Sequence, residues 1–139
     1  MQKRPRLIPE VAHARTKLAQ ALEKAGVISG DRVVLAVSGG SDSLALALAM
    51  NFVGSKLGIE SQVVVVDHDL QEGSAQIALR AAATCKEMGL ADSKVVKVAV
   101  KQNGDGLEAA ARAARYQVLE KARQSIAAKA IILAHTKDD

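Results

Sequence analysis

The feature that most constrains this chain is a stretch at residues 33–48, where an apolar run of strand length meets a polar glycine turn and then an Ala/Leu-rich helical pattern. The turn has the sequence Ser38-Gly39-Gly40-Ser41-Asp42-Ser43. Glycines let a backbone approach a ligand closely, and the start of a helix offers unpaired N–H groups and a dipole that favours an anion. A strand, a glycine turn and a helix in this order therefore predict a phosphate-binding loop.

Helical and strand patterns alternate along the chain. Apolar, largely β-branched runs at 32–37, 62–67, 94–100 and 130–134 are separated by helical patterns at 9–25, 42–57, 73–88 and 107–127. Buried strands that alternate with helices predict an α/β fold, with a parallel sheet and helices on both faces. Ligands of such sheets bind where the strands end, at a topological switch point. Polar residues follow all four predicted strands, so we expect the functional site at that edge.

Size and charge divide the chain into two predicted parts. The 139 residues, 49% of them apolar, suffice for one domain with its own core. The net charge is +4, and residues 1–17 alone account for it. We therefore predict a basic N-terminal helical segment at 1–30 and a nucleotide-binding domain at 31–139. The basic segment is either a solvated arm and helix face or an electrostatic contact for a polyanion such as RNA.

Cysteine usage and hydropathy bear on the cellular setting. Cys85 is the one cysteine, which excludes a disulfide framework and a cysteine metal site and predicts a small core residue. No apolar stretch of the sequence is long and uninterrupted enough to span a membrane. We expect a reducing, cytoplasmic setting.

The glycine turn differs from other phosphate loops. It lacks the Gly-Lys-Ser/Thr ending of a Walker A loop, so no lysine is placed on a γ-phosphate. Its hydroxyls and amides suit an anion, and Asp42 is a candidate to hold a divalent metal on that anion. The alternative is a plain Ser/Gly turn in which Asp42 caps the following helix.

The pattern Ser38-Gly39-Gly40-x-Asp42-Ser43 resembles the signature of the PP-loop ATP pyrophosphatases. These enzymes cleave ATP between its α- and β-phosphates and adenylate an oxygen of a substrate. Further motifs narrow the resemblance to the bacterial tRNA(Ile)-lysidine synthetase family: Asp67-His68, the Arg112 and Arg115 pair within Ala109–Tyr116, and His135-Thr136-x-Asp138-Asp139. The similarity runs from about residue 30 to the end and implies an adenine nucleotide alpha hydrolase-like, Rossmann-like fold.

The resemblance implies a two-step reaction. ATP adenylates the C2 carbonyl oxygen of the wobble cytidine in an isoleucine tRNA, and pyrophosphate leaves. The ε-amine of free L-lysine then attacks C2, and AMP leaves. The implied ATP-binding residues are Ala36, Ser38, Gly39, Gly40, Ser41, Asp42, Ser43, Asp67 and His68, with Mg²⁺ on Asp42. The implied catalytic residues are Asp42, Arg112, Arg115, His135, Asp138 and Asp139.

The sequence departs from the family at one loop. The family commonly has Asp-His-Gly-Leu-Arg after the second strand, whereas this chain has Asp67-His68-Asp69-Leu70-Gln71. The change removes a permissive backbone position and a positive charge near the nucleotide.

Several alternatives stay open at this stage. Arg112 and Arg115 share a helix face and either contact phosphate or form a solvated face with Glu108. His135, Asp138 and Asp139 line the reaction cleft, hold a metal, or in the case of His135 cap a following helix. Other functions are a different PP-loop ATPase such as a tRNA thiolase, disfavoured by the single cysteine, and a non-catalytic adenine-nucleotide-binding module.

The end of the chain carries a further expectation. It stops a few residues after the fourth predicted strand, so we expect a piece of a longer protein, truncated there. Recognition of tRNA(Ile) would then rely on domains mostly outside this chain. Sheet surface left uncovered invites self-association as a homodimer.

Overall fold

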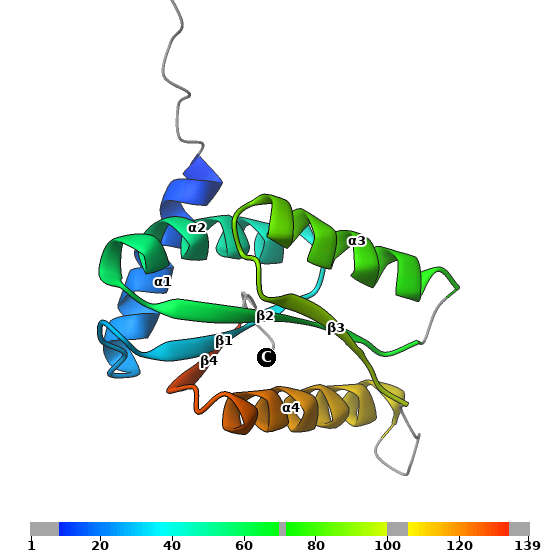
Figure 1. Cartoon of the computed structure of the whole chain (residues 1–139). Helices are drawn as coiled ribbons and strands as arrows, with labels where there is room; N and C mark the ends of the chain where they lie inside the picture. Colours follow the sequence, from blue (N-terminus) through cyan, green and yellow to red (C-terminus); the bar gives the residue numbers. More distant parts are fainter. Residues whose placement is uncertain (1–8, 70–71, 100–105, 134–139) are drawn as a thin grey trace, which may run out of the picture.

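The structure is a computed structural model of the chain, and it describes residues 9–69, 72–99 and 106–133 (Figure 1). Helices and strands alternate in the predicted order. They are α1 (Pro9–Lys24), β1 (Arg32–Val37), α2 (Ser41–Leu57), β2 (Glu60–Asp67), α3 (Ser74–Glu87), β3 (Ser93–Lys97), α4 (Leu107–Ser125) and β4 (Ala130–Leu133). The predicted α/β class is confirmed, although β2 starts earlier and β3 ends earlier than predicted.

The four strands form one parallel sheet in the order β3-β2-β1-β4. The chain steps outward from β1 through β2 to β3, and α4 then returns it to the other side of β1. In the register of the sheet, Val33 of β1 lies between Ser61 of β2 and Ala130 of β4. The strand order therefore reverses at β1, and the turn that follows this strand lies at the switch point of the sheet.

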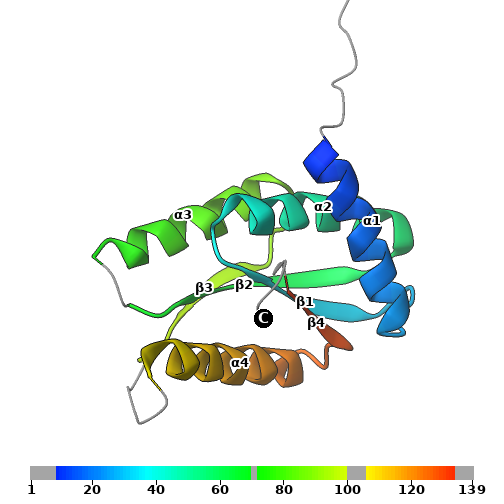
Figure 2. The same cartoon turned by 180° about the vertical axis from the view of Figure 1, so that it is seen from behind.

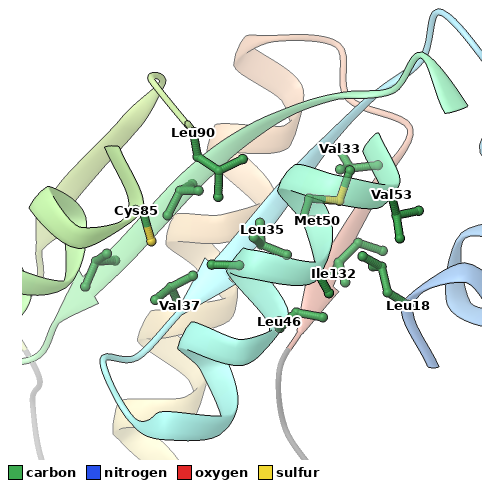
Figure 3. Close-up of a cluster of buried hydrophobic side chains, with 14 of the residues drawn as sticks. Leu18, Val33, Leu35, Val37, Leu46, Met50, Val53, Cys85, Leu90 and Ile132 are labelled. Carbon is green, nitrogen blue, oxygen red and sulfur yellow. The ribbon is translucent and has the colours of Figure 1, made fainter. Parts of the chain in front are cut away.

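The sheet separates two hydrophobic clusters. Helices α1, α2 and α3 cover one face and α4 covers the other, as the two opposite views show (Figures 1 and 2). Val33, Leu35 and Val37 contribute to the larger cluster, which also holds Cys85, whereas Val34 and Ala36 pack towards α4. Figure 3 shows side chains of the larger cluster between sheet and helices. Cys85 is fully buried, so its prediction as a core residue is confirmed.

A glycine explains where α2 ends. Gly58 adopts a left-handed conformation (φ 74°), and its N–H donates to the carbonyl of Gly54, so a glycine caps the C-terminal end of α2. Within the part of the chain that the structure describes, no helix combines the length and hydropathy that a membrane crossing needs.

Candidate functional site

The glycine turn joins the end of β1 to the start of α2. Gly39 has a φ of 100°, a backbone conformation that a residue with a side chain adopts only under strain. Gly40 occupies the N-cap of α2 with an extended backbone and no side-chain cap. The alternative in which Asp42 caps this helix is therefore wrong, because Asp42 lies within its first turn. The N–H groups of that first turn have no acceptor inside the helix and are available to an anion.

The hydroxyl of Ser43 closes the turn from inside. Ser43 is 3% exposed, and its Oγ accepts from the backbone N–H groups of Ser38 and Gly39, each at 3.1 Å. The Ser43 hydroxyl donates to the carbonyl oxygen of Gly40 at 3.0 Å, and the Ser38 hydroxyl donates to the Ser43 Oγ at 3.1 Å. Ser43 thus shapes the loop, a role that the sequence pattern did not reveal.

Asp67 is the last residue of β2, and His68 follows it on the opposite side of the sheet. Successive strand residues alternate between faces, so Asp67 follows Val65 on the side of α3, and His68 follows Val66 on the side of α4. Asp67 is 4% exposed, and its Oδ1 accepts the backbone N–H of Asp69 at 2.9 Å. This hydrogen bond lowers the pKa of the Asp67 carboxyl, against the opposing effect of burial.

Asp69 occupies the position where the resembled family has glycine. Its φ is 55°, so the backbone is left-handed here, as a glycine would permit without strain. Aspartate tolerates this conformation better than most residues do. Its carboxylate lies 3.4 Å from Nζ of Lys97, in an exposed ion pair. The departure from the family pattern therefore keeps the backbone of the turn, while Gln71 lies outside the described residues.

A cavity of about 230 Å³ opens beside the glycine turn, on the side of α4. Its apolar lining comes from β1 and β2, and its polar lining from the turn, the end of β2 and α4. The lining residues are Ala36, Val37, Ser38, Ser43, Val64, Val66, His68 and Arg115. An apolar floor with a few convergent polar groups is typical of small-molecule sites.

Two buried nitrogen atoms of the cavity residues, Nδ1 of His68 and Nε of Arg115, have no hydrogen-bond partner among the described residues. Burial lowers the pKa of His68, and the positive charge of Arg115 lowers it further, against the opposing effect of Asp67. His68 is therefore held in its neutral form beside a fixed cation. Unpaired buried polar atoms are costly in a folded protein, which indicates a ligand or a water molecule at this place.

The structure brings some of the predicted site residues together and leaves others apart. Ala36, Ser38, Ser43, His68 and Arg115 line the cavity. The Asp67 side chain lies on the other side of the sheet, and Arg112 lies one turn before Arg115 in an exposed position on α4. The side chains of Ser41 and Asp42, and all of His135, Asp138 and Asp139, lie outside what the structure describes.

Sequence reasoning missed two residues of the apolar floor, Val64 and Val66, which lie there beside the predicted Ala36. Their alternation with Val63 and Val65 in β2 was a usable signal, because every second residue of a strand faces the same side. Across the described ranges 9–69, 72–99 and 106–133, no group of three or more His, Cys, Asp or Glu side chains is placed to hold a metal ion.

A parallel sheet with a glycine turn at its switch point, and an arginine beside that turn, defines the class of nucleotide-binding α/β domains. The family model of the PP-loop domain matches residues 11–139, and the chain belongs to this family.

Curated relatives carry the name tRNA(Ile)-lysidine synthase. A protein of that name from Bifidobacterium longum is 49% identical over 107 residues, which are 77% of this chain and 28% of the relative. Another from Thermobifida fusca is 47% identical over 131 residues, which are 94% of this chain and 40% of the relative. The chain thus spans well under half the length of these relatives.

A solved structure supports the fold independently. The U34-tRNA thiolase NcsA from Methanococcus maripaludis, with its [4Fe-4S] cluster, is similar with a TM-score of 0.75 over 91% of this chain and 46% of that one. The sequence identity is 17%, so this likeness bears on the fold alone.

Proposed function

We propose that this chain is the ATP-binding part of a ligase that joins free lysine to the wobble cytidine of an isoleucine tRNA. The observation that carries the proposal is the cavity in which Ser38, His68 and Arg115 meet beside the glycine turn. Membership of the PP-loop family and the similarity to proteins named tRNA(Ile)-lysidine synthase support it.

The cavity residues fit the parts of a nucleotide. The guanidinium of Arg115 suits a phosphate, because its planar fork pairs with two oxygen atoms. The neutral ring of His68 both donates and accepts a hydrogen bond, which suits a ribose hydroxyl or a base edge. The floor formed by Ala36, Val64 and Val66 suits the flat face of a purine. We assign Gly39 and Gly40 to the pyrophosphate, with the first turn of α2.

The proposed reaction needs positioning and charge stabilisation more than a protein nucleophile. In the first step the C2 oxygen of cytidine bonds to the α-phosphorus while the bond to the bridging oxygen of pyrophosphate breaks. In the second step the lysine amine bonds to C2, AMP departs with the oxygen, and the amine loses a proton. Arg115 and the helix start would stabilise the negative charge that develops on the phosphates.

We assign Mg²⁺ to Asp42, and this assignment needs no cluster of acidic residues. Magnesium is usually held by one or two carboxylates together with substrate phosphates and water. Asp42 lies in the first turn of α2, next to the proposed phosphate position. The ion would neutralise charge on the phosphates.

Further catalytic roles fall to residues outside the described part. We propose that Asp138 or Asp139 orients the ammonium group of lysine and that His135 lines the same cleft. Arg112 would add positive charge at the cleft mouth.

Domains outside this chain would carry most tRNA recognition. A cytoplasmic location and a homodimer stay predictions, and sedimentation of the chain tests the latter.

Release of AMP from ATP tests the proposal, in a protein that contains this chain. We expect release to require both lysine and isoleucine tRNA. Arg115→Gln should reduce the rate by about a hundredfold, as loss of one charge-stabilising donor does. Arg80→Gln, an exposed charge change on α3, should leave it unaltered. Release without lysine and tRNA, or dependence on a sulfur donor, would favour another PP-loop ATPase. Binding of ATP with no AMP would favour a non-catalytic module.

A further inference from the structure

The carboxylate of Asp67 is buried at the end of β2, away from the cavity beside the glycine turn. Asp67 is 4% exposed and lies on the side of α3, whereas the cavity opens on the side of α4 and is lined by His68. Burying an ionised carboxylate costs free energy unless hydrogen bonds compensate for the lost water. The hydrogen bonds of Asp67 therefore indicate what this buried charge does.

The hydrogen bond of the Asp67 side chain spans His68. Its Oδ1 accepts the backbone N–H of Asp69 at 2.9 Å, which closes a turn with His68 as the middle residue. On the strand side, the carbonyl oxygen of Asp67 accepts the backbone N–H of Val98 at 2.9 Å. The backbone is thus tied down both before and after His68, so the His68 side chain leaves the end of the sheet in one direction.

The ring of His68 depends on this backbone for its direction. Its Nδ1 is buried and has no hydrogen-bond partner among the described residues, although the ring lines the cavity together with Arg115. The backbone of Asp69 is left-handed (φ 55°), a conformation that residues with a side chain seldom adopt. Such a turn needs an added interaction to hold it.

The exposed ion pair between Lys97 and Asp69 is the weaker of two interactions that could hold the turn. Nζ of Lys97 lies 3.4 Å from Oδ2 of Asp69, and the two side chains are 63% and 55% exposed. Exposed ion pairs contribute little to stability and are screened by salt. A hydrogen bond from an N–H group to an ionised carboxylate is charge-assisted and strong. The buried carboxylate of Asp67 is therefore the main anchor of the turn.

We propose that Asp67 is a positioning residue, whose buried carboxylate holds the turn that orients the ring of His68 into the cavity. In this role Asp67 does not contact the nucleotide, in contrast to the direct ATP contact that the family resemblance implies. The inference rests on the proposed function for the identity of the ligand that His68 meets.

Three substitutions separate the hydrogen bond of Asp67 from its charge. Asp67→Asn keeps an oxygen that can accept the Asp69 N–H and loses the charge, whereas Asp67→Ala loses both. Asp67→Val serves if the alanine variant does not fold, because strands favour a β-branched side chain. We expect calorimetry to show ATP affinity lowered by roughly tenfold in Asp67→Ala and Asp67→Val, the factor for one lost hydrogen bond to the ligand. Asp67→Asn should retain most of the affinity.

The matched control removes a hydrogen bond of the same kind from a turn at the other end of β1. Oδ2 of Asp31 accepts the backbone N–H of Ile28 at 2.8 Å, just before β1 begins. Asp31→Ala should leave ATP affinity unchanged.

The pKa of His68, measured by NMR titration, reports the position of the ring independently of stability. Its signal is assigned by comparison with His68→Gln. Burial and the charge of Arg115 lower this pKa, and the charge of Asp67 raises it. Asp67→Asn should lower the pKa of His68 further, because the charge is lost while the ring stays in place. Asp67→Ala should raise it towards 6.5, because the ring leaves its buried position beside Arg115.

Several results would overturn the proposal. If ATP affinity falls as far in Asp67→Asn as in Asp67→Ala, the charge itself acts on the ligand. Unaltered affinity in both Asp67→Ala and Asp67→Val also contradicts a positioning role, as does a pKa of His68 that falls in every variant. If the wild-type chain binds no ATP, the proposed function fails, and the opposite pKa shifts still decide whether Asp67 orients His68.

Discussion

Ser43 shows how one side chain holds the glycine turn in shape from inside. Its hydroxyl accepts two backbone N–H groups and donates to a third residue of the turn. Ser43→Ala removes these three hydrogen bonds from a part-buried turn, which should lower the free energy of unfolding by about 1–3 kcal/mol. We also expect ATP affinity to fall by at least about tenfold, since the turn loses its shape. Urea denaturation and calorimetry measure the two effects.

The exposed Ser55 of the same helix supplies the control for this prediction. Ser55→Ala should change neither stability nor ATP affinity appreciably. Unaltered ATP affinity in a stably folded Ser43→Ala variant would show that the turn keeps its shape without the hydroxyl.

His68 links the site to pH. Burial and the charge of Arg115 lower its pKa in the folded chain below the ordinary value of 6.5. His68 therefore binds a proton more readily in the unfolded chain. The free energy of unfolding rises with pH between the lowered pKa of His68 in the folded chain and 6.5. We expect the free energy of unfolding to fall as the pH is lowered from about 7.5 to about 5.5, and to fall less in His68→Gln. Urea denaturation at each pH gives these values.

His13 provides the comparison for the pH series, because it is exposed on α1. His13→Gln should follow the wild-type pH dependence. If the free energy of unfolding changes with pH equally in the wild type, His68→Gln and His13→Gln, His68 is not the group responsible.

At the scale of elements, the helices on the two faces of the sheet have different consequences for the site. Leu119 of α4 and Leu18 of α1 are both almost fully buried, on opposite faces. Leu119→Ala and Leu18→Ala should each cost about 2–5 kcal/mol of stability. ATP affinity should fall in the first alone, because α4 carries Arg115 into the cavity. Urea denaturation and calorimetry separate the two effects, and an equal loss of affinity would contradict this division.

The elements themselves were largely predictable. Four apolar runs separated by amphipathic patterns indicate strands and helices locally, and residues 32–37 match β1 as predicted. The conformation inside a turn depends on contacts that no periodicity encodes, so the inward hydroxyl of Ser43 could not be foreseen. The left-handed backbone at Asp69 had a signal, since the resembled family has glycine there. The opposite directions of Asp67 and His68 also follow from strand alternation, once the bounds of β2 are known.

At the scale of the whole molecule, the site depends on a strand order that local patterns do not contain. The alternation of elements predicted a parallel sheet and a switch point, but not which strand would lie beside β1. The structure places β2 on one side and β4 on the other. The glycine turn therefore leaves the sheet at an interior strand, where neighbours on both sides hold it in position.

The position of β4 in the sheet has a consequence for folding during synthesis on the ribosome, because β4 is the last strand to be made. Val33 pairs with Ser61, one helix further along the chain, but also with Ala130, which lies beyond α2, α3 and α4. The second pairing is among the most distant in sequence, and such contacts slow folding. Until residues 130–133 leave the exit tunnel, the outer edge of β1 offers its backbone N–H and C=O groups to any strand nearby. A nascent chain of this fold therefore passes through a period in which its later central strand is an unpaired edge.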